Sequence, residues 1–493
     1  MDYLKMFRFL FSLATVFHLN FQQLYAQQHT KAEKIDRYIQ NKLANNNIPG
    51  LAVAVVHYDT IIISKGYGLN SDKKPLTANS PFAIASLSKG FTAMAVMQLV
   101  GCGLVDLDKP VINYLPSFTI NDSHGSIITV RNLLNQTSGL ADAGFPELAF
   151  KQPIHNFDEL ILRLKSARLV SKPGQQFHYH NPNYEILAKL VEEVSHERFS
   201  DYLQKHIFDP LTMTHTWDVL STKSFNTDSR RLSDGHIYFL GKPIVHREPE
   251  WFVEGAAGII SSADDMAHWL TVQLKNGQFN NTELLKSKYM NMMHLAPPGT
   301  SSSYGMGWFL NKDSTLYHSG ILWTYSSQQI LFTKNGYGIV MLFNGGTNAF
   351  VDYYSFLGDI NDIINNIEPE SSFIPTWLIE GLAGLVFLTG ILSAIRQLLR
   401  LKQWFKNYYK RPVWRSCLYM ILRLMPLLLL VFVPRIITLL SGRVLNWSRI
   451  FLMFPDIIIG FGLIGLINLI VVLSRFIYLF KNFKSLPTTL NLN

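Results

Sequence analysis

Hydrophobic and polar residues follow several different periods along the chain, and each change of period predicts an element. Residues 30–47 repeat apolar side chains at helical spacing, whereas residues 51–57 and 60–66 form two strand-like runs separated by Tyr58-Asp59. This order predicts a helix followed by an antiparallel hairpin. Apolar residues then recur at helical spacing in a long segment that continues to about Gly101, and we expect a second helix there.

The middle of the chain has helical patterns and its later part has strand patterns. Helices are expected at residues 128–140 (capped at Thr129), 157–170 and 184–194. Strands are expected at residues 304–308, 315–318, 327–333 and 339–343, with Asn335-Gly336 as a hairpin turn and a closing helix near 350–367. Helices in the middle with strands at both ends predict one sheet covered by helices, an α/β or α+β layer.

Three segments beyond Ser371 are each 19 residues long and mostly apolar, which is enough to span a bilayer core: 377–395, 416–434 and 455–473. The connector 396–415 carries seven Lys and Arg residues and no acid, so the positive-inside rule places it in the cytoplasm. Arg423 lies inside the second span. We expect its side chain to reach the membrane surface or to pack against a partner, rather than to form a functional site.

The first 26 residues are typical of a secretory signal. Lys5 and Arg8 precede a Phe/Leu-rich run, and the segment ends at Ala26, where we expect cleavage. An uncleaved anchor is the alternative, and both predict that the residues after this segment are exported. We therefore predict a signal peptide at 1–26, a folded region at 27–372 outside the cytoplasm, and a membrane region at 373–493.

The net charge of +9 is unevenly distributed. Residues 373–493 hold 14 basic and 2 acidic residues, a net charge of +12, and residues 27–372 hold 28 basic and 32 acidic residues, a net charge of −4. The basic character belongs to the membrane region, so it does not indicate a nucleic-acid partner. The two cysteines, Cys102 and Cys417, form neither a disulfide framework nor a zinc site, and Cys102 is expected to be buried.

Ser86-Leu-Ser-Lys89 stands at the start of the predicted helix that ends near Gly101. Residues three apart are neighbours on one helix face, so Lys89 is placed to take a proton from Ser86 if its pKa is lowered. The helix N-terminus would direct free N–H groups towards negative charge that develops near Ser86. Ser71-Asp-Lys-Lys74 has the same spacing, but its polar surroundings and Pro75 indicate a turn.

Two further motifs supply partners for Ser86. Tyr179-His-Asn181 precedes a predicted helix, and His318-Ser-Gly320 lies on a predicted strand before a hairpin. Tyr289-Met-Asn291 also fits the Tyr-x-Asn pattern, but it lies in an apparent helix of ordinary composition. Each motif is weak by itself, and their order along the chain makes the set specific.

Together these motifs resemble the serine β-lactamase and penicillin-binding-protein superfamily, in its class C-like branch. The resemblance covers about residues 33–365. Four neighbouring stretches also match: Ile48–Gly50, Leu133–Leu140, Gly255–Asp265 and Tyr304–Trp308. The resemblance implies an α+β fold, in which an antiparallel sheet flanked by helices adjoins an all-helical lobe and the site lies between them. The three-span tail is not part of the resemblance.

The resemblance also implies roles for the motif residues. Ser86 would attack a carbonyl to form an acyl-enzyme, while Lys89 and Tyr179 share the activating proton. Asn181 would bind a substrate amide, beside His318 and Gly320. The backbone N–H groups of Ser86 and Ile321 would form the oxyanion hole. No cofactor and no metal ion are implied, and the substrate would be a small molecule, a peptide or a cell-wall-derived amide.

His318 departs from the many β-lactamases that carry lysine at this place, and histidine is found in D-peptidases, D-aminopeptidases and esterases. We therefore expect a membrane-anchored serine hydrolase that acts on ester or amide bonds. A class C-like β-lactamase and a penicillin-binding sensor without turnover are the alternatives. A histidine is mostly neutral near pH 7, so His318 is expected to gain charge, and to attract a substrate carboxylate, as the pH falls towards 5.

Overall fold

The computed structural model describes residues 31–226, 230–299, 302–348, 351–369, 376–408 and 412–482. The predicted signal peptide lies outside these residues. The chain forms two compact units. The first contains Met1–Ile237 and Pro243–Phe373, and the second contains Tyr238–Lys242 and Ile374–Asn493. Each unit is described by itself.

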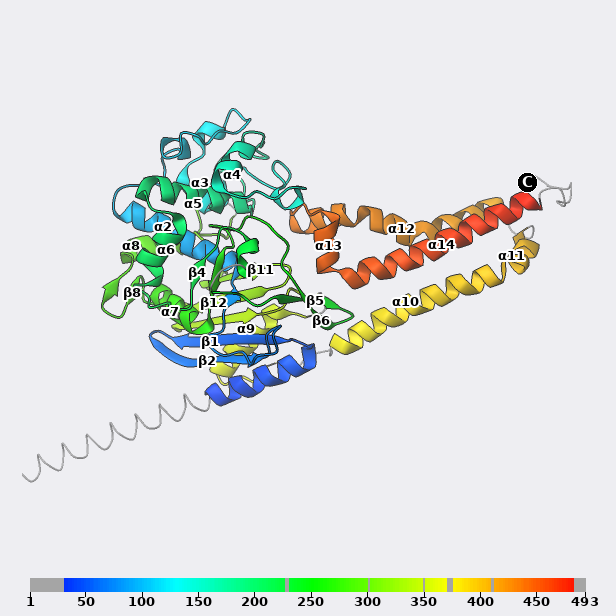
Figure 1. Ribbon diagram of the computed structural model, residues 1–493, viewed down its shortest axis with the longest axis horizontal. Coiled ribbons are helices and arrows are strands. Elements are labelled where there is room, and N and C mark those ends of the chain that lie inside the picture. Colours follow the sequence, from blue (N-terminus) through cyan, green and yellow to red (C-terminus); the bar gives the residue numbers. More distant parts are fainter. Residues whose placement is uncertain are drawn as a thin grey trace, which may run out of the picture. The chain divides into compact units, whose positions relative to one another are not determined.

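The first unit is built on a six-stranded antiparallel sheet, in which the first long strand is an interior strand (Figure 1). The spatial order is β10 (Phe309–Leu310), β11 (Thr315–Ile321), β12 (Ser326–Phe332), β13 (Tyr337–Phe343), β1 (Gly50–His57) and β2 (Thr60–Gly68). The hairpins predicted at Tyr58-Asp59 and Asn335-Gly336 are confirmed, because β1 pairs with β2 and β12 pairs with β13.

Both faces of β1 are covered, which explains why its sequence is a continuous apolar run. Its residues Leu51, Val53 and Val55 pack against the helix at residues 31–46 and against α9 (Tyr353–Ile364). On the opposite face, α7 (Ala263–Leu274) packs over β1 and β13. Fully burying side chains of this size contributes about 1.5–3 kcal/mol each, so this strand is a major part of the core.

A helical lobe lies beside the sheet and is organised around α5 (Asn181–Ser195) (Figure 1). The helices that contact α5 are α2 (Ser88–Gly101), α3 (Val130–Leu134), α4 (Phe157–Leu164) and α6 (Phe199–Leu203). α3 begins after Thr129, as predicted, because the Thr129 side chain accepts a hydrogen bond from the Asn132 N–H and the two residues form a capping box. The predicted α+β fold with an adjoining helical lobe is confirmed.

The first unit contains several shorter elements. The small sheets are β3 (Phe82–Ala83) with β7 (Ile259–Ser261) and β4 (Trp217–Asp218), and β8 (Gln278–Phe279) with β9 (Thr282–Glu283). The hairpin of β5 (Gly235–Phe239) and β6 (Lys242–His246) has residues in both units. The remaining α-helix is α8 (Ser287–Met293). Short helical turns are η1 (Ala85–Leu87), η2 (Val111–Asn113), η3 (Gly125–Ile127), η4 (Glu147–Ala149), η5 (Gln204–Phe208) and η6 (Thr222–Asn226).

Four sequence-based expectations about local structure are wrong. The helix expected at 157–170 ends at Leu164. Residues 304–308 form a turn instead of a strand, with only a single bridge between Tyr304 and Phe309. The helix at 128–140 ends at Leu134, since Gln136 adopts a left-handed backbone with φ of +58° that a continuing helix excludes. Cys102 is exposed, because it follows the last turn of α2.

The second unit contains three helices that are long and apolar enough to cross a membrane, as predicted: α10 (Thr376–Leu399), α12 (Val413–Ser441) and α14 (Pro455–Lys481). Two shorter helices, α11 (Leu401–Tyr408) and α13 (Trp447–Met453), accompany them. Arg423 of α12 donates a hydrogen bond of 2.9 Å to Asn468 of α14. The expectation that Arg423 packs against a partner is confirmed.

Candidate active site

Ser86 lies in η1, which is fixed against the sheet immediately before α2 begins. The Ser327 hydroxyl on β12 donates a hydrogen bond of 2.6 Å to the Ile84 carbonyl. A Cβ atom on Gly320 would lie 2.3 Å from the same carbonyl oxygen, so only glycine allows η1 to approach β11 this closely. Ala85 has a φ of +50°, a conformation that non-glycine residues rarely adopt. The backbone that carries Ser86 is therefore held in a strained conformation by tertiary contacts.

Lys89 is completely buried, and its ammonium group donates three hydrogen bonds. They run to Ser86 Oγ at 3.1 Å, to Asn181 Oδ1 at 2.9 Å and to the Ala256 carbonyl at 2.9 Å. The ring centroid of Tyr179 lies 4.9 Å from Nζ. The structure thus brings together four residues that the sequence predicted for the site, and it adds a backbone acceptor at Ala256.

The Ala256 carbonyl was not identified from the sequence, because a backbone oxygen gives no side-chain signal. The stretch that contains it, Gly255–Asp265, is one of those that match the family pattern. Thr92 of α2 donates a hydrogen bond of 2.6 Å to the neighbouring Gly255 carbonyl. Gly255 has a φ of +79°, and a Cβ atom there would lie 2.5 Å from the Ala188 side chain on α5. This glycine therefore allows the loop to fit between α2 and α5 and to direct the Ala256 carbonyl at Lys89.

His318 is buried on β11, and both of its ring nitrogens have partners. Nδ1 lies 2.8 Å from the Ser319 carbonyl, which can only accept, so Nδ1 carries the proton. Nε2 then accepts a hydrogen bond from the Tyr304 hydroxyl at 3.2 Å. Burial, together with the nearby Lys89 ammonium, lowers the pKa of His318 to about 3. The expectation that this imidazole becomes charged between pH 8 and pH 5 is therefore wrong, because the sequence did not reveal its burial.

Ile321 lies at the end of β11 and is about half exposed. The N–H of the next residue, Leu322, donates to the Tyr325 carbonyl. Because N–H groups alternate sides along an antiparallel strand, the Ile321 N–H points away from β12. This direction leaves it available to an oxygen outside the sheet ladder, as an oxyanion-hole donor requires.

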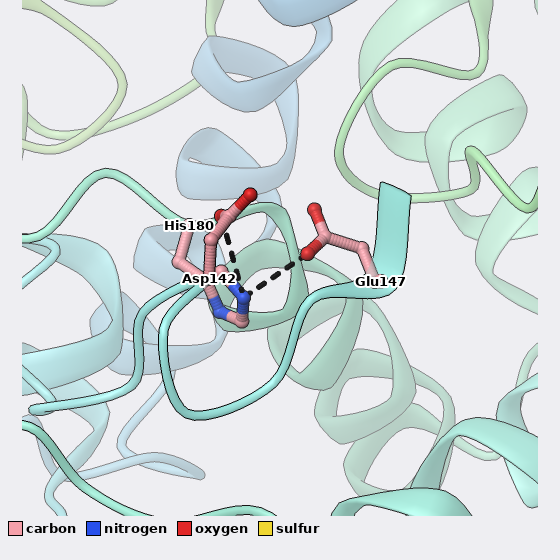
Figure 2. A group of neighbouring side chains, drawn as sticks. All are labelled: Asp142, Glu147 and His180. Carbon is pink, nitrogen blue, oxygen red and sulfur yellow. Dashed lines mark ion pairs between the residues drawn. The ribbon is translucent and has the colours of Figure 1, made fainter. Parts of the chain in front are cut away.

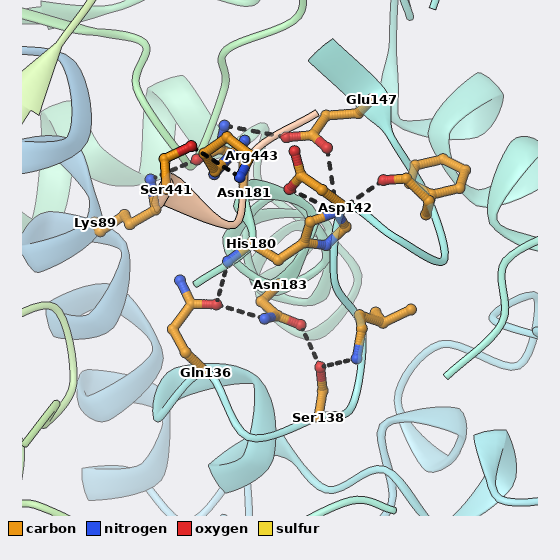
Figure 3. A network of polar contacts seen from close by, with 12 residues as sticks. Lys89, Gln136, Ser138, Asp142, Glu147, His180, Asn181, Asn183, Ser441 and Arg443 are labelled. Carbon is orange, nitrogen blue, oxygen red and sulfur yellow. Dashed lines mark hydrogen bonds and ion pairs between the residues drawn. The ribbon is translucent and has the colours of Figure 1, made fainter. Parts of the chain in front are cut away.

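Asn181 begins α5, and Pro182 at the first turn favours this helix start. The approach of the chain to α5 is fixed by Gln136, which is fully buried. The Gln136 carbonyl accepts from the His178 N–H at 2.8 Å. Gln136 Oε1 accepts from the His180 N–H at 3.0 Å (Figure 3). Gln136 lies in the matched stretch Leu133–Leu140, but no signal in that stretch assigned it this role.

A buried group of titratable side chains lies directly behind Asn181, and the sequence analysis missed it. His180 Nε2 is 3.1 Å from Glu147 Oε2 and 3.8 Å from Asp142 Oδ1 (Figure 2). One ligand atom from each residue lies within 4.8 Å of the others, so by geometry these three residues could hold a metal ion. His180 occupies the middle of the Tyr-x-Asn motif, a position that the motif leaves unspecified.

The second copies of the two motifs lie in other surroundings. Ser71 and Lys74 belong to a turn in which the Lys74 N–H donates to Asn70 Oδ1 at 2.8 Å, and Lys74 is exposed. Tyr289 and Asn291 lie within α8, as expected.

An antiparallel sheet with a helical lobe, and a buried lysine that joins a serine on η1 to an asparagine at the start of α5, define a serine β-lactamase and penicillin-binding-protein architecture. A family model described as Beta-lactamase matches residues 35–355, and the chain belongs to this family.

Individual relatives agree with this assignment. The chain is 30% identical to Protein flp of Staphylococcus aureus strain N315 over 318 residues, which are 63% of each protein, so the match leaves more than a third of that relative uncovered. It is 28% identical to the putative penicillin-binding protein PbpX of Bacillus subtilis over 345 residues, which are 69% of this chain and 80% of that protein. The solved octameric penicillin-binding protein homologue from Pyrococcus abyssi shares the fold, with a TM-score of 0.58 and 22% identity over 69% of this chain and 79% of that chain.

Proposed function

We propose that this chain is a membrane-anchored serine hydrolase that cleaves ester or amide bonds through an acyl-enzyme, in the manner of a D-peptidase, a D-aminopeptidase or an esterase. The observation that carries the proposal is the hydrogen bond between the fully buried Lys89 and Ser86. Burial disfavours the charged form of a lysine. A neutral Lys89 keeps two N–H groups for Asn181 and Ala256 and has a lone pair that can accept the Ser86 proton.

The reaction begins when Ser86 Oγ attacks the substrate carbonyl carbon and its proton passes to Lys89 or Tyr179. The carbonyl oxygen becomes an oxyanion, which the N–H groups of Ser86 and Ile321 stabilise. When the tetrahedral intermediate collapses, the bond to the leaving group breaks and the stored proton passes to that group. Water then attacks the acyl-enzyme carbonyl and gives one proton to the same base. The acyl–Oγ bond of Ser86 breaks, the base returns the proton to Oγ, and the acid leaves.

The neutral state of His318 supports the choice of substrate class. An imidazole with a pKa of about 3 offers no fixed positive charge to a substrate carboxylate at physiological pH. Substrates without a carboxylate at that place are therefore favoured over those that need such an anchor. A class C-like β-lactamase is the runner-up function, and a sensor that is acylated without turnover is the alternative of another class.

The proposed organisation is a signal peptide at 1–26, a hydrolase domain at 27–372 outside the cytoplasm, and a membrane region at 373–493. The three apolar helices and the basic connector 396–415 support it. Reporters fused after Asn366 and at about Arg443 should be active only outside the cytoplasm, whereas one near Tyr408 should report the cytoplasm. A cytoplasmic signal at Asn366 would overturn this orientation.

The decisive test measures turnover and covalent labelling on the same purified full chain. The substrates are a chromogenic cephalosporin, p-nitrophenyl esters, and D-amino-acid amides and peptides, and the label is a fluorophosphonate. Turnover of esters or D-amino-acid amides supports the proposed hydrolase. Cephalosporin turnover alone supports the β-lactamase, labelling without any turnover supports the sensor, and absence of both rejects all three.

A further inference from the structure

We infer that Glu147, supported by His180 and Asp142, is a positioning residue that sets the amide orientation of Asn181 beside Ser86 and Lys89. The inference rests on the proposed function, since it gives Glu147 a part in that reaction. It starts from the contacts of Asn181, which Figure 3 shows between Lys89 and Glu147.

The two neighbours of the Asn181 amide have opposite hydrogen-bonding character. Lys89 donates to the amide oxygen, both as an ammonium and as a neutral amine with two N–H groups, and the Glu147 oxygen that faces the amide accepts from it. Lys89 Nζ lies 2.9 Å from Asn181 Oδ1, and Asn181 Nδ2 lies 3.3 Å from Glu147 Oε1. With these two neighbours in place, turning the amide over would bring donor against donor and acceptor against acceptor. Glu147 therefore selects a single orientation of the Asn181 amide.

This orientation divides the hydrogens of the amide between protein and substrate. Nδ2 carries two hydrogens, and Glu147 accepts one of them. The second hydrogen can be donated to a carbonyl oxygen of an amide substrate. In the opposite orientation Asn181 would turn its oxygen away from Lys89, and Lys89 would lose one of the three acceptors that fix its ammonium group near Ser86.

The Glu147 carboxylate is itself positioned by two further side chains, those of His180 and Asp142. His180 Nε2 lies 3.1 Å from Glu147 Oε2 and 3.8 Å from Asp142 Oδ1 (Figure 2). The same nitrogen lies 2.9 Å from the Phe145 carbonyl. The side chains of Asp142 and His180 are fully buried, and that of Glu147 is 5% exposed. Because His180 and Asn181 are adjacent at the start of α5, the histidine and the asparagine contact the two oxygens of one carboxylate from neighbouring backbone positions.

The contacts of His180 favour a hydrogen-bonded group over a metal centre. Its Nε2 lies 2.9 Å from the Phe145 carbonyl, which can only accept, so Nε2 carries a proton and donates it to that carbonyl. A ring nitrogen binds a metal ion only without its proton. His180 Nε2 therefore acts as a donor, with Glu147 Oε2 at 3.1 Å and Asp142 Oδ1 at 3.8 Å beside it.

Exchanging the carboxylate and the amide between positions 147 and 181 tests the inference. In Glu147→Gln the new amide meets a donor on both sides, Asn181 and His180, and its NH2 group opposes one of them. In Asn181→Asp two carboxylates face each other. In the double variant the oxygen of the new glutamine faces the Nε2–H of His180, and its NH2 group donates to the new aspartate. The second oxygen of that aspartate accepts from Lys89, so both contacts of residue 181 are satisfied again.

We expect Glu147→Gln to slow fluorophosphonate labelling of Ser86 by about 10–100-fold, the range that a small misplacement of a reacting group produces. Asn181→Asp should be slower still. The double variant should label faster than Asn181→Asp and come within about tenfold of the parent. Its kcat/KM for D-amino-acid amides should stay low, because an aspartate has no N–H for the substrate. Glu193→Gln, at a half-exposed position on the same helix, is the matched control and should behave like the parent.

Thermal unfolding of the parent, the two single variants and the double variant separates this inference from the proposed function. A double-mutant cycle on the melting temperature should show coupling between positions 147 and 181, whether or not the parent is labelled. An unlabelled parent that shows coupling rejects the hydrolase and supports the contact. Parental labelling rates in Glu147→Gln, or a double variant no better than Asn181→Asp, would overturn the inference. A stoichiometric Zn²⁺ or Mn²⁺ ion that is lost in His180→Gln would also overturn it.

Discussion

The chain contains the pattern Ser-x-x-Lys twice, at Ser86–Lys89 and at Ser71–Lys74, and the two copies have opposite surroundings. Lys89 is completely buried and donates hydrogen bonds to three oxygens. Lys74 is exposed in a turn that closes on Asn70, and Lys73 in that turn has a left-handed φ of +60°.

The difference teaches that spacing brings the serine and the lysine together, while distant residues decide whether the pair is a site. Two of the acceptors of Lys89 come from Asn181 and Ala256, which are 92 and 167 positions away. An exposed lysine keeps its hydration and its proton, whereas a buried lysine gives up its proton more easily. The comparison therefore predicts unequal effects for the same substitution at the two copies.

The largest difference is expected for the serines. Ser86→Ala should abolish fluorophosphonate labelling and lower turnover by at least ~10⁴-fold, because it removes the proposed nucleophile. Ser71→Ala should leave both measurements unchanged. Loss of labelling in the Ser71 variant, with a labelled Ser86 variant, would reverse the assignment.

The lysines should show the next largest difference. Lys89→Met keeps the length of the side chain but removes the proposed base, and it should slow acylation by roughly 10²–10⁴-fold. Lys74→Met should change the rate by less than about twofold, since an exposed turn residue touches no part of the site. Rates of labelling under single-turnover conditions measure both variants, and equal rates would contradict the role of Lys89.

Alanine substitutions at two glycines, Gly320 and Gly358, test whether stability and activity depend on the close contact between η1 and β11. Gly320→Ala places a Cβ atom 2.3 Å from the Ile84 carbonyl oxygen, so η1 has to move and Ser86 moves with it. We expect a loss of about 1–3 kcal/mol of stability and a decrease of roughly 10²-fold in kcat/KM. Gly358→Ala in α9 has open space around its Cβ atom and should instead stabilise the protein by about 0.5–1 kcal/mol. Thermal unfolding measures the stability of both variants, and kcat/KM measures their activity. Parental activity in Gly320→Ala would show that η1 tolerates displacement.

The smallest effect is expected for pH. Because the pKa of His318 is lowered to about 3, only about 1% of this imidazole is charged at pH 5. The ratio of kcat/KM for carboxylate-bearing and neutral substrates should therefore stay within about twofold from pH 5 to pH 8. The unfolded chain binds this proton near pH 6.5, so His318 lowers the stability of the folded state as the pH falls below that value. A ratio that rises steeply towards pH 5 would show that His318 is charged in the enzyme–substrate complex.

Local signals predicted the hairpins and most of the helices, since each depends on residues that are close in the sequence. The turn at 304–308 was misread because Tyr304, Met306 and Trp308 alternate with glycines, as in a strand. All three side chains are buried, but the reason is that the turn packs against the start of α2. A Cβ atom on Gly307 would lie 2.7 Å from Gly90 Cα.

Motif spacing predicted Ser86, Lys89 and Asn181, which the structure brings into contact. It could not identify the Ala256 carbonyl, because a backbone oxygen has no side-chain signature. Glu147 and Asp142 were also missed, since their link to the site depends on how the loop before η4 folds against α5. The charge state of His318 depends on burial, and one strand sequence does not reveal how deeply its side chain lies.

The first strand to leave the ribosome, β1, needs the last strand of the domain as its neighbour. Leu51 pairs opposite Phe343, 292 positions further along the chain. At a synthesis rate of about 5–20 residues per second, the β1–β2 hairpin waits roughly 15–60 s for β13 to emerge. During that interval β1 has an open edge and an apolar face that α7 has yet to cover, and such edges recruit strands of other chains. We therefore expect that production of this protein in quantity depends on shielding the hairpin, for example by a holding chaperone, until the sheet can close.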